Sequence, residues 1–140
     1  MTVTAGFGQY FEDAILNWFR GTAFPAVPGT LYLALFTTPP VNGTDAAAVE
    51  VSGTSYARKS FTPNTTNFGA PSGAAPAAIV LGANQVFATP GGSWGTVTGW
   101  AIYDAASAGN LIAYGTFTGV AVGSGDTVEF LSGNLTLNVS

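Results

Sequence analysis

Short apolar segments alternate with turn sequences along the second half of this chain. Each segment has the length of a strand and is rich in β-branched or aromatic residues. The segments are Ala78–Gly82, Gln85–Ala88, Thr96–Asp104, Leu111–Gly119, Thr127–Leu131 and Leu135–Val139. The sequences between them, PGGSWG, AASAGN, GSGD and SGN, contain the Gly, Asn, Asp and Ser residues that favour tight turns. The pattern therefore predicts antiparallel hairpins.

Two further strands are predicted in the first half. Leu31–Phe36 (LYLALF) is continuously apolar, as is typical of a strand buried on both faces, and Pro39 and Pro40 end it. Tyr56–Thr62 is the next strand-like segment. With about seven or eight short strands separated by turns, we expect an all-β fold, an antiparallel β-sandwich. The length of 140 residues indicates one domain, residues 1–140.

One helix is expected at about residues 7–20. Apolar residues recur there at intervals of three and four, which predicts an amphipathic helix whose polar face carries Glu12 and Asp13. Arg20 suits the negative end of the helix dipole, and Gly21 suits the left-handed conformation that ends many helices. The apolar stripe is rich in aromatic residues, and we expect it mainly to pack on the body of the domain. Docking to a partner is the alternative.

A long loop or arm is predicted at about residues 63–78. Its composition is almost entirely Asn, Thr, Gly, Ala, Pro and Ser, with Phe68 as the one large apolar residue.

The predicted strands carry apolar residues on both faces. Trp100 and Ile102 would face one side of the sheet, and Ala101 and Tyr103 the other. Part of the outer face is therefore expected to be covered, unless Tyr and Thr simply face solvent there.

The charge composition excludes several classes of function. Only 7% of the residues are charged, against about 25% in a typical domain. The formal net charge is -4 and there are three basic residues, so neither nucleic acid nor an anionic membrane is an expected partner. The longest strongly apolar run is Leu31–Phe36, far short of the roughly 20 residues that span a bilayer.

The composition also argues against catalysis, a metal or a cofactor. The chain has no His and no Cys, which removes the usual general bases, thiol nucleophiles and thiolate or imidazole metal ligands. No pair of carboxylates is marked out for acid–base chemistry. Asp104 and Asp126 flank turns, where Asp side chains commonly accept hydrogen bonds from the backbone. We therefore predict a protein that is not an enzyme, with no catalytic, metal or cofactor residues.

A few polar and aromatic residues are candidates for contact with a partner. Arg58 and Lys59 are adjacent in a predicted strand and would point to opposite faces. Arg58 is either an internal clamp to the long loop or a contact to an acidic partner. Trp94 lies in a glycine-rich loop without the Lys of a phosphate-binding loop. The residues predicted to contact partners are Arg58, Lys59, Asn64, Asn67, Phe68 and Trp94.

Four blocks of the sequence resemble a family of small virion proteins of tailed bacteriophages. The blocks are Leu31–Pro39, Glu50–Arg58, Trp94–Gly115 and Ser124–Leu137, and they follow a short N-terminal helix as in that family. The resemblance spans most of the chain. Such proteins are labelled tail fibre, decoration or structural proteins, so the resemblance implies a virion component made in the cytoplasm of a bacterial host.

The low charge and the apolar strand faces agree with a subunit whose surface is occupied by neighbours. We expect a capsid cement or decoration protein, because one compact domain offers no fibrous repeat or coiled coil. Its partners would be the major capsid protein and other virion subunits in a multi-copy assembly. A tail fibre or baseplate component is the first alternative. A carbohydrate-binding β-sandwich module that uses exposed Trp94 and Trp100 is the second.

Overall fold

A computed structural model describes residues 4–139 and confirms the predicted all-β class, with 39% strand and 8% helix. Every pair of strands in it is antiparallel. In chain order the elements are β1 (Thr4–Phe7), α1 (Gln9–Phe19), β2 (Leu31–Thr38), β3 (Val49–Glu50), β4 (Lys59–Phe61), β5 (Ala77–Val80), β6 (Gln85–Val86), β7 (Gly95–Tyr103), β8 (Leu111–Val122), β9 (Glu129–Phe130) and β10 (Thr136–Val139).

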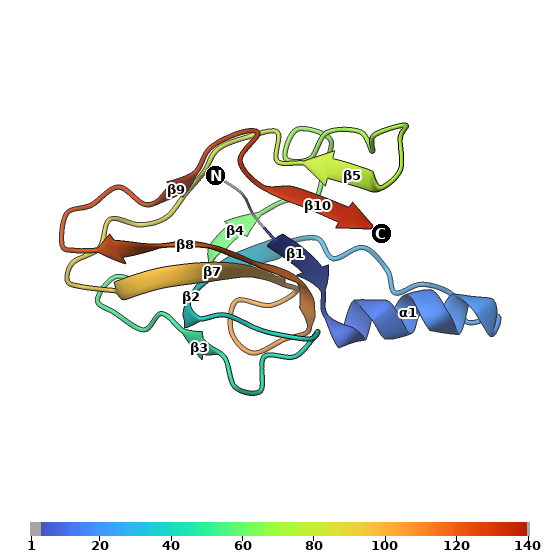
Figure 1. The fold of residues 1–140 in the computed structure, drawn as a ribbon, viewed down its shortest axis with the longest axis horizontal. Coiled ribbons are helices and arrows are strands. Elements are labelled where there is room, and N and C mark those ends of the chain that lie inside the picture. Colours follow the sequence, from blue (N-terminus) through green and yellow to red (C-terminus); the bar gives the residue numbers. More distant parts are fainter. Residues whose placement is uncertain (1–3, 140) are drawn as a thin grey trace.

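A six-stranded sheet forms the body of the molecule (Figure 1). Its order is β1-β8-β7-β2-β3, and β4 pairs with the first part of β2. Two short ribbons, β5–β10 and β6–β9, complete a sandwich-like arrangement. The neighbouring strands β2 and β7 carry the longest runs of buried residues, as suits strands that are covered on both faces.

The main core lies between the sheet and the two ribbons. The sheet contributes Leu33, Leu35, Trp100 and Ile102, and the segments that flank or form the ribbons contribute apolar residues of their own, which are Leu81, Phe87, Phe130 and Leu135. A second, smaller cluster lies on the opposite face of the same strands and contains Ala34, Phe36, Ala101, Tyr103 and Leu111. Both faces of β2 and β7 are therefore covered, and the chain itself supplies the cover.

The helix starts later than predicted. Phe7 was expected in it, but Phe7 belongs to β1 and pairs with Ala113 of β8. Gly8 separates the two elements: its backbone is extended, and its N–H donates to the carbonyl of Ile112 at 2.8 Å. This close approach needs glycine, because a Cβ at position 8 would overlap the Leu111 carbonyl oxygen. At the other end, Gly21 has a φ of 83°, as predicted.

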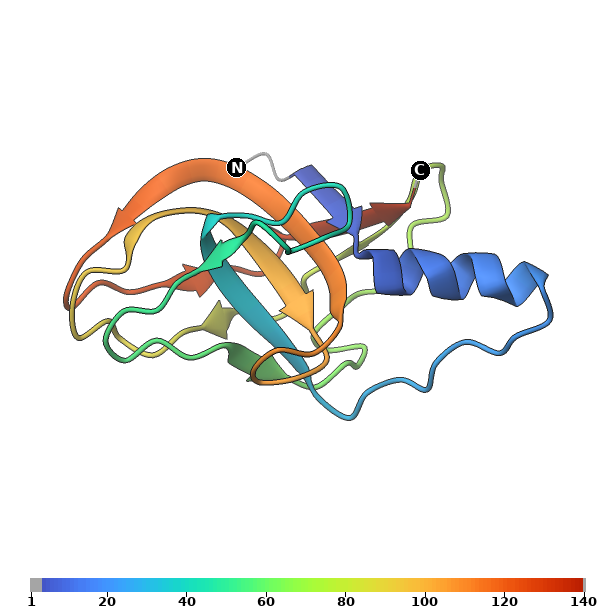
Figure 2. The same ribbon diagram turned by 90° about the horizontal axis from the view of Figure 1, so that it is seen from below.

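The expectation that the helix packs mainly on the domain is wrong for most of its length. Figure 2 shows α1 extending away from the sheet, with the following segment returning beside it. Ala14 is the one buried residue of α1. The first turn contacts the body: the N–H of Gln9 donates to the carbonyl of Gly43 at 2.8 Å, and the Phe11 ring lies 5.3 Å from that of Phe7. The Phe11 ring also lies 6.4 Å from that of Phe24 in the returning segment. An amphipathic stripe does not by itself specify what it packs against.

The predicted strands are found, with shorter bounds in several places. The segment Tyr56–Thr62 contains only the three-residue β4, and Thr127–Leu131 only the two-residue β9. The predicted loop over 63–78 ends where β5 begins, at Ala77. The very short β1 and β3 were not predicted, because both are defined by pairing with distant strands.

Candidate interaction surfaces

The carboxylates predicted to stabilise turns do so. Asp104 accepts hydrogen bonds from the backbone N–H and the side-chain amide of Asn110, both at 2.7 Å. Asp126 accepts from the N–H of Gly123 at 2.7 Å.

Over residues 4–139 no group of three or more acidic, His or Cys side chains could hold a metal ion. No helix in the same range is long and apolar enough to cross a membrane.

Arg58 is the centre of a charged cluster beside Tyr103, on the sheet face that carries the smaller apolar cluster. Its side chain is 7% exposed and forms a bidentate ion pair with Glu50, with N–O distances of 2.8 Å. It donates to the carbonyls of Ala105 and Ala108 and stacks over the Tyr103 ring at 3.9 Å. Arg58 is thus an internal clamp, as one of the two sequence interpretations held, but it holds the 104–110 turn and not the long loop.

Burial and charge perturb the titration of this cluster. Burial raises the pKa of Tyr56 far above its ordinary value, and Glu50, which accepts its O–H at 2.9 Å, adds to the rise. Burial likewise raises the pKa of Tyr103, whose hydroxyl donates to Asp45 at 2.7 Å. Burial alone would lower the pKa of Arg58, but Glu50 holds it above its ordinary value. The two phenols therefore stay protonated and Arg58 stays charged at neutral pH, as suits a structural tie.

The tryptophans proposed as a sugar-binding platform are buried. Trp94 is 4% exposed and Trp100 is 0% exposed, so neither can stack on a carbohydrate. Trp94 packs edge-on against Tyr56 and donates its indole N–H to the carbonyl of Thr54 at 3.0 Å. Gly53 makes room for this ring. The expectation that Trp94 and Trp100 are exposed is therefore wrong, and the carbohydrate-binding alternative loses the two residues on which it rested.

The remaining predicted contact residues belong to β4 and to the segment that follows it. Lys59 is partly exposed in β4. Asn64 is exposed and caps a turn by accepting from the N–H groups of Thr66 and Asn67. Asn67 donates to the carbonyl of Thr62 and accepts from Gln85, so its amide is already used. These residues and Phe68 lie close to one another along the 59–68 segment.

An apolar groove opens beside this segment, between the β5–β10 ribbon, the base of α1 and the sheet. Its volume is about 510 Å³. The wall on the loop side includes Asn64, Phe68 and Pro71, the wall on the helix side includes Phe11, and Val139 lies on the ribbon side. Phe68 packs edge-on against Phe61 at 5.9 Å and is thereby fixed in place. We refer to this hollow as the apolar groove.

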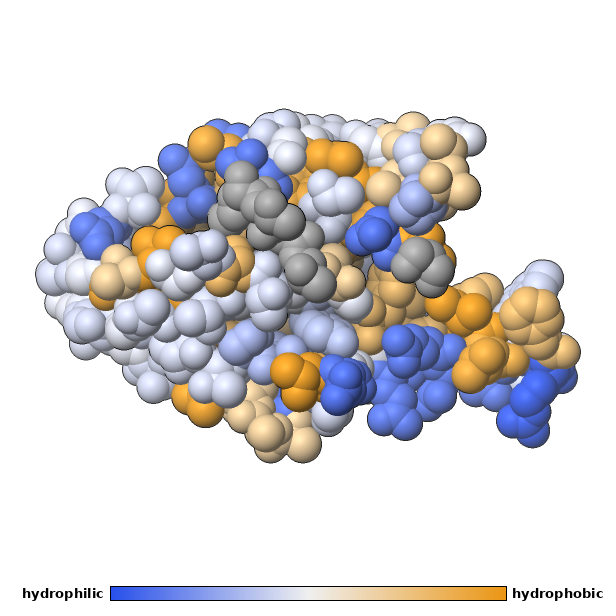
Figure 3. All heavy atoms as spheres, in the orientation of Figure 1, coloured by the Kyte–Doolittle hydropathy of each residue, from blue (hydrophilic) through white to orange (hydrophobic). Residues whose placement is uncertain are grey.

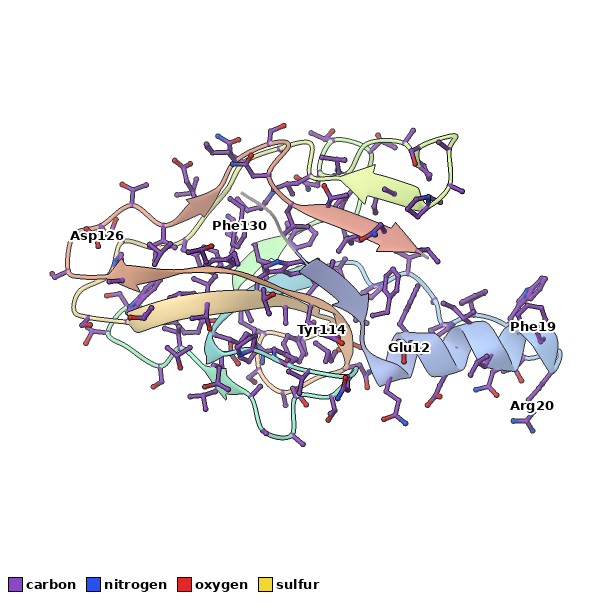
Figure 4. All side chains as sticks on the ribbon, viewed as in Figure 1. Glu12, Phe19, Arg20, Tyr114, Asp126 and Phe130 are labelled. Atoms are coloured by element: carbon purple, nitrogen blue, oxygen red, sulfur yellow. The ribbon has the colours of Figure 1, made fainter. Side chains whose placement is uncertain are left out.

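The α1 tip is the most exposed apolar feature of the helix. We use this name for Leu16, Trp18 and Phe19, which are 63%, 57% and 77% exposed. Figure 4 shows Phe19 and Arg20 at the free end of α1, on different sides of it. In Figure 3 apolar surface follows the upper side of α1 from its base to its tip. Sequence reasoning recognised the stripe but not its exposure.

The fold and these surfaces define a class: a small all-β domain in which Arg58 and the turn carboxylates bond within the domain. Its exposed features are apolar, namely the α1 tip and the apolar groove. In a comparison with protein families, residues 6–138 match the family described as podophage GP4 fiber I protein gp80. The chain belongs to this family. It is a component of the phage virion, as the sequence resemblance implied. A search of curated proteins finds no match.

Proposed function

We propose that this chain is a tail fibre subunit that acts by contact with other virion proteins and catalyses no reaction. The match of residues 6–138 to a fibre family carries this proposal. The exposed α1 tip and the apolar groove supply surfaces that such a subunit needs, because exposed apolar patches mark sites of association. The family description supports a fibre role, so we place it ahead of cement, which was the first expectation from the sequence.

A capsid cement protein is the second candidate. It is favoured by the absence of a fibrous repeat or coiled coil among residues 4–139, which form one compact sandwich-like body with a single projecting helix. In that case the major capsid protein would be the partner.

Both candidates require residues 1–140 to act as one domain. This proposal is supported by the pairing of β1 with β8 and of β5 with β10 across long stretches of sequence.

The two candidates differ in copy number and in position on the particle. Purified virions are stripped of their tails, and the head and tail fractions are compared on a gel for a 14.1 kDa band. A fibre subunit stays with the tails, in few copies. A band that stays with the heads at a copy number comparable to the major capsid protein contradicts the fibre proposal and supports cement.

We propose that the 59–68 segment and the loop up to residue 78 contact these virion partners. Lys59, Asn64, Asn67 and Phe68 belong to this surface, whereas Arg58 and Trp94 act indirectly by holding the fold. The test is to replace the exposed residues Gly73 and Ala74 by aspartate, which keeps the hydrogen bonds between Ser72 and Ala78 in place. We expect an unchanged melting temperature and a loss of incorporation into particles. Normal incorporation of this variant would contradict this assignment.

A further inference from the structure

We infer that the apolar groove of one copy of this chain binds the α1 tip of another copy. The contact joins two different surfaces of the chain, so it is of the heterologous, head-to-tail kind. The inference does not depend on the position of the subunit in the virion. It rests on the apolar character of both surfaces, on their separation within one copy, and on the charges near them.

The groove has the size and the lining of a site for apolar side chains. Its volume is about 510 Å³, within the range of about 300–1,000 Å³ that is usual for binding sites. Among the described residues, Asn64 is the only polar one in its lining. The aromatic walls are preformed, since Phe11 packs against Phe7 and Phe68 packs against Phe61. An occupant must be apolar, because a polar group would lose its hydrogen bonds to water there.

The α1 tip supplies side chains of this kind. The rings of Trp18 and Phe19 pack edge-on at 5.2 Å and form one exposed aromatic unit. A helix of eleven residues is about 16 Å long, and Figure 2 shows α1 projecting from the body. The groove lies at the base of the same helix, beside Phe11, so a tip cannot fill the groove of its own copy. It can fill the groove of another.

Charge favours the approach of a tip to the base of another helix. Arg20 follows the tip, whereas Glu12 and Asp13 lie near the base, as Figure 4 shows for Glu12 and Arg20. In the part of the chain that the structure describes, the ion pair found is that of Arg58 with Glu50, so none of these three charges has an opposite partner within its own copy. A tip is therefore attracted by the base of another helix and repelled by another tip.

The area of the contact predicts its strength. Enclosed aromatic side chains bury about 150–250 Å² each. Because the tip is already partly covered by its own helix, we expect it to lose about 350 Å² of exposed surface on entering the groove. The total over both copies, about 700 Å², is below the roughly 1,000 Å² of a stable complex. The contact is therefore weak, and it is populated where copies are held together at about millimolar effective concentration.

The first test observes the indole N–H of Trp18 by NMR. The isotope-labelled full chain is kept dilute, and unlabelled chain is added up to about 1 mM, where weak complexes form. We expect the Trp18 signal to shift progressively with the added chain. The indole signals of Trp94 and Trp100 should stay in place, because both rings are buried in the core of their own copy.

Unlabelled variants then identify the surface that Trp18 meets. A tipless variant, with Trp18→Ala and Phe19→Ala, keeps the groove and should still shift the labelled signal. Val139→Lys places a charge in the groove wall that also repels Arg20, and we expect about tenfold weaker binding. Val120→Lys is the matched control: both valines are 54% exposed, but Val120 lies in β8 outside the groove lining, so this variant should act like the wild type.

Each outcome of this test decides for or against the inference. A Trp18 signal that does not move with up to about 1 mM of added chain overturns it. Equal effects of Val139→Lys and Val120→Lys overturn it as well, because Trp18 would then meet a surface other than the groove. Loss of the shift with the tipless variant would show that tips bind tips. Unchanged melting temperatures verify that the variants are folded.

The second test uses the absence of cysteine from this chain. Phe19→Cys, at the tip, is mixed under mild oxidation with Val139→Cys, in the groove wall. We expect a disulfide between the two chains to form faster than in a mixture of Phe19→Cys with Val120→Cys. Equal rates in the two mixtures would overturn the inference, because they would show random collision rather than a defined contact.

Discussion

Replacement of Arg58 by methionine is the sharpest test of the charged cluster. Methionine keeps most of the apolar stem and removes the guanidinium, so it leaves Glu50 without its ion-pair partner and the carbonyls of Ala105 and Ala108 without their donor. Loss of one member of a buried pair costs about 3–5 kcal/mol. Because the Glu50 side chain is 28% exposed, water can solvate it in part, and the lower end of about 3 kcal/mol applies.

The assay is urea unfolding followed by tryptophan fluorescence, together with a thermal scan. A loss of about 3 kcal/mol corresponds to a fall in melting temperature of roughly 9 °C for a domain of this size. Lys59→Met is the matched control: it removes the adjacent, partly exposed cation and should change the free energy of unfolding by less than about 0.5 kcal/mol. If Arg58→Met also costs less than about 1 kcal/mol, the cluster is not a structural tie and the reasoning fails.

Three further outcomes follow from the structure. Trp18→Ala should leave the melting temperature within about 2 °C of the wild type, because the side chain is 57% exposed; a large fall would mean that it is part of the core. Gly8→Ala should destabilise the chain by about 1–3 kcal/mol in urea unfolding, because the new methyl group overlaps the Leu111 carbonyl; an unchanged urea midpoint would refute this. The raised pKa values of Tyr56 and Tyr103 mean that these phenols ionise near pH 10 only after unfolding, so stability should fall as the pH rises above about 10. A urea midpoint that is the same at pH 8 and pH 11 would contradict this.

The strands that carry their own turn sequences could be predicted from the chain alone. The segment Thr96–Asp104 and the turn closed by Asp104 are examples, because β-branched residues and a nearby hydrogen-bonding side chain are local properties. In contrast, β1 and β3 have no local pattern of their own. Thr4 becomes part of a strand only because it lies opposite Thr116.

The candidate surfaces were harder to predict than the fold. The aromatic stripe of the helix is the same whether it packs on its own domain or on another, so its exposure at Phe19 was not encoded in the periodicity. Trp94 was expected among the partner contacts, but Gly53 lets the ring approach the backbone and enter the core. Phe68 was identified correctly as the distinctive residue of the loop, yet the groove beside it required strands from both halves of the chain.

The order of the strands has a consequence for synthesis on the ribosome. The main core needs Phe130 and Leu135, which are translated long after the central strand β2. Until those residues emerge, the nascent chain exposes the apolar face that carries Leu33 and Leu35. Such a chain folds late and is prone to aggregate or to engage chaperones while it is being made. Arrest of translation before β9 should therefore give an insoluble product.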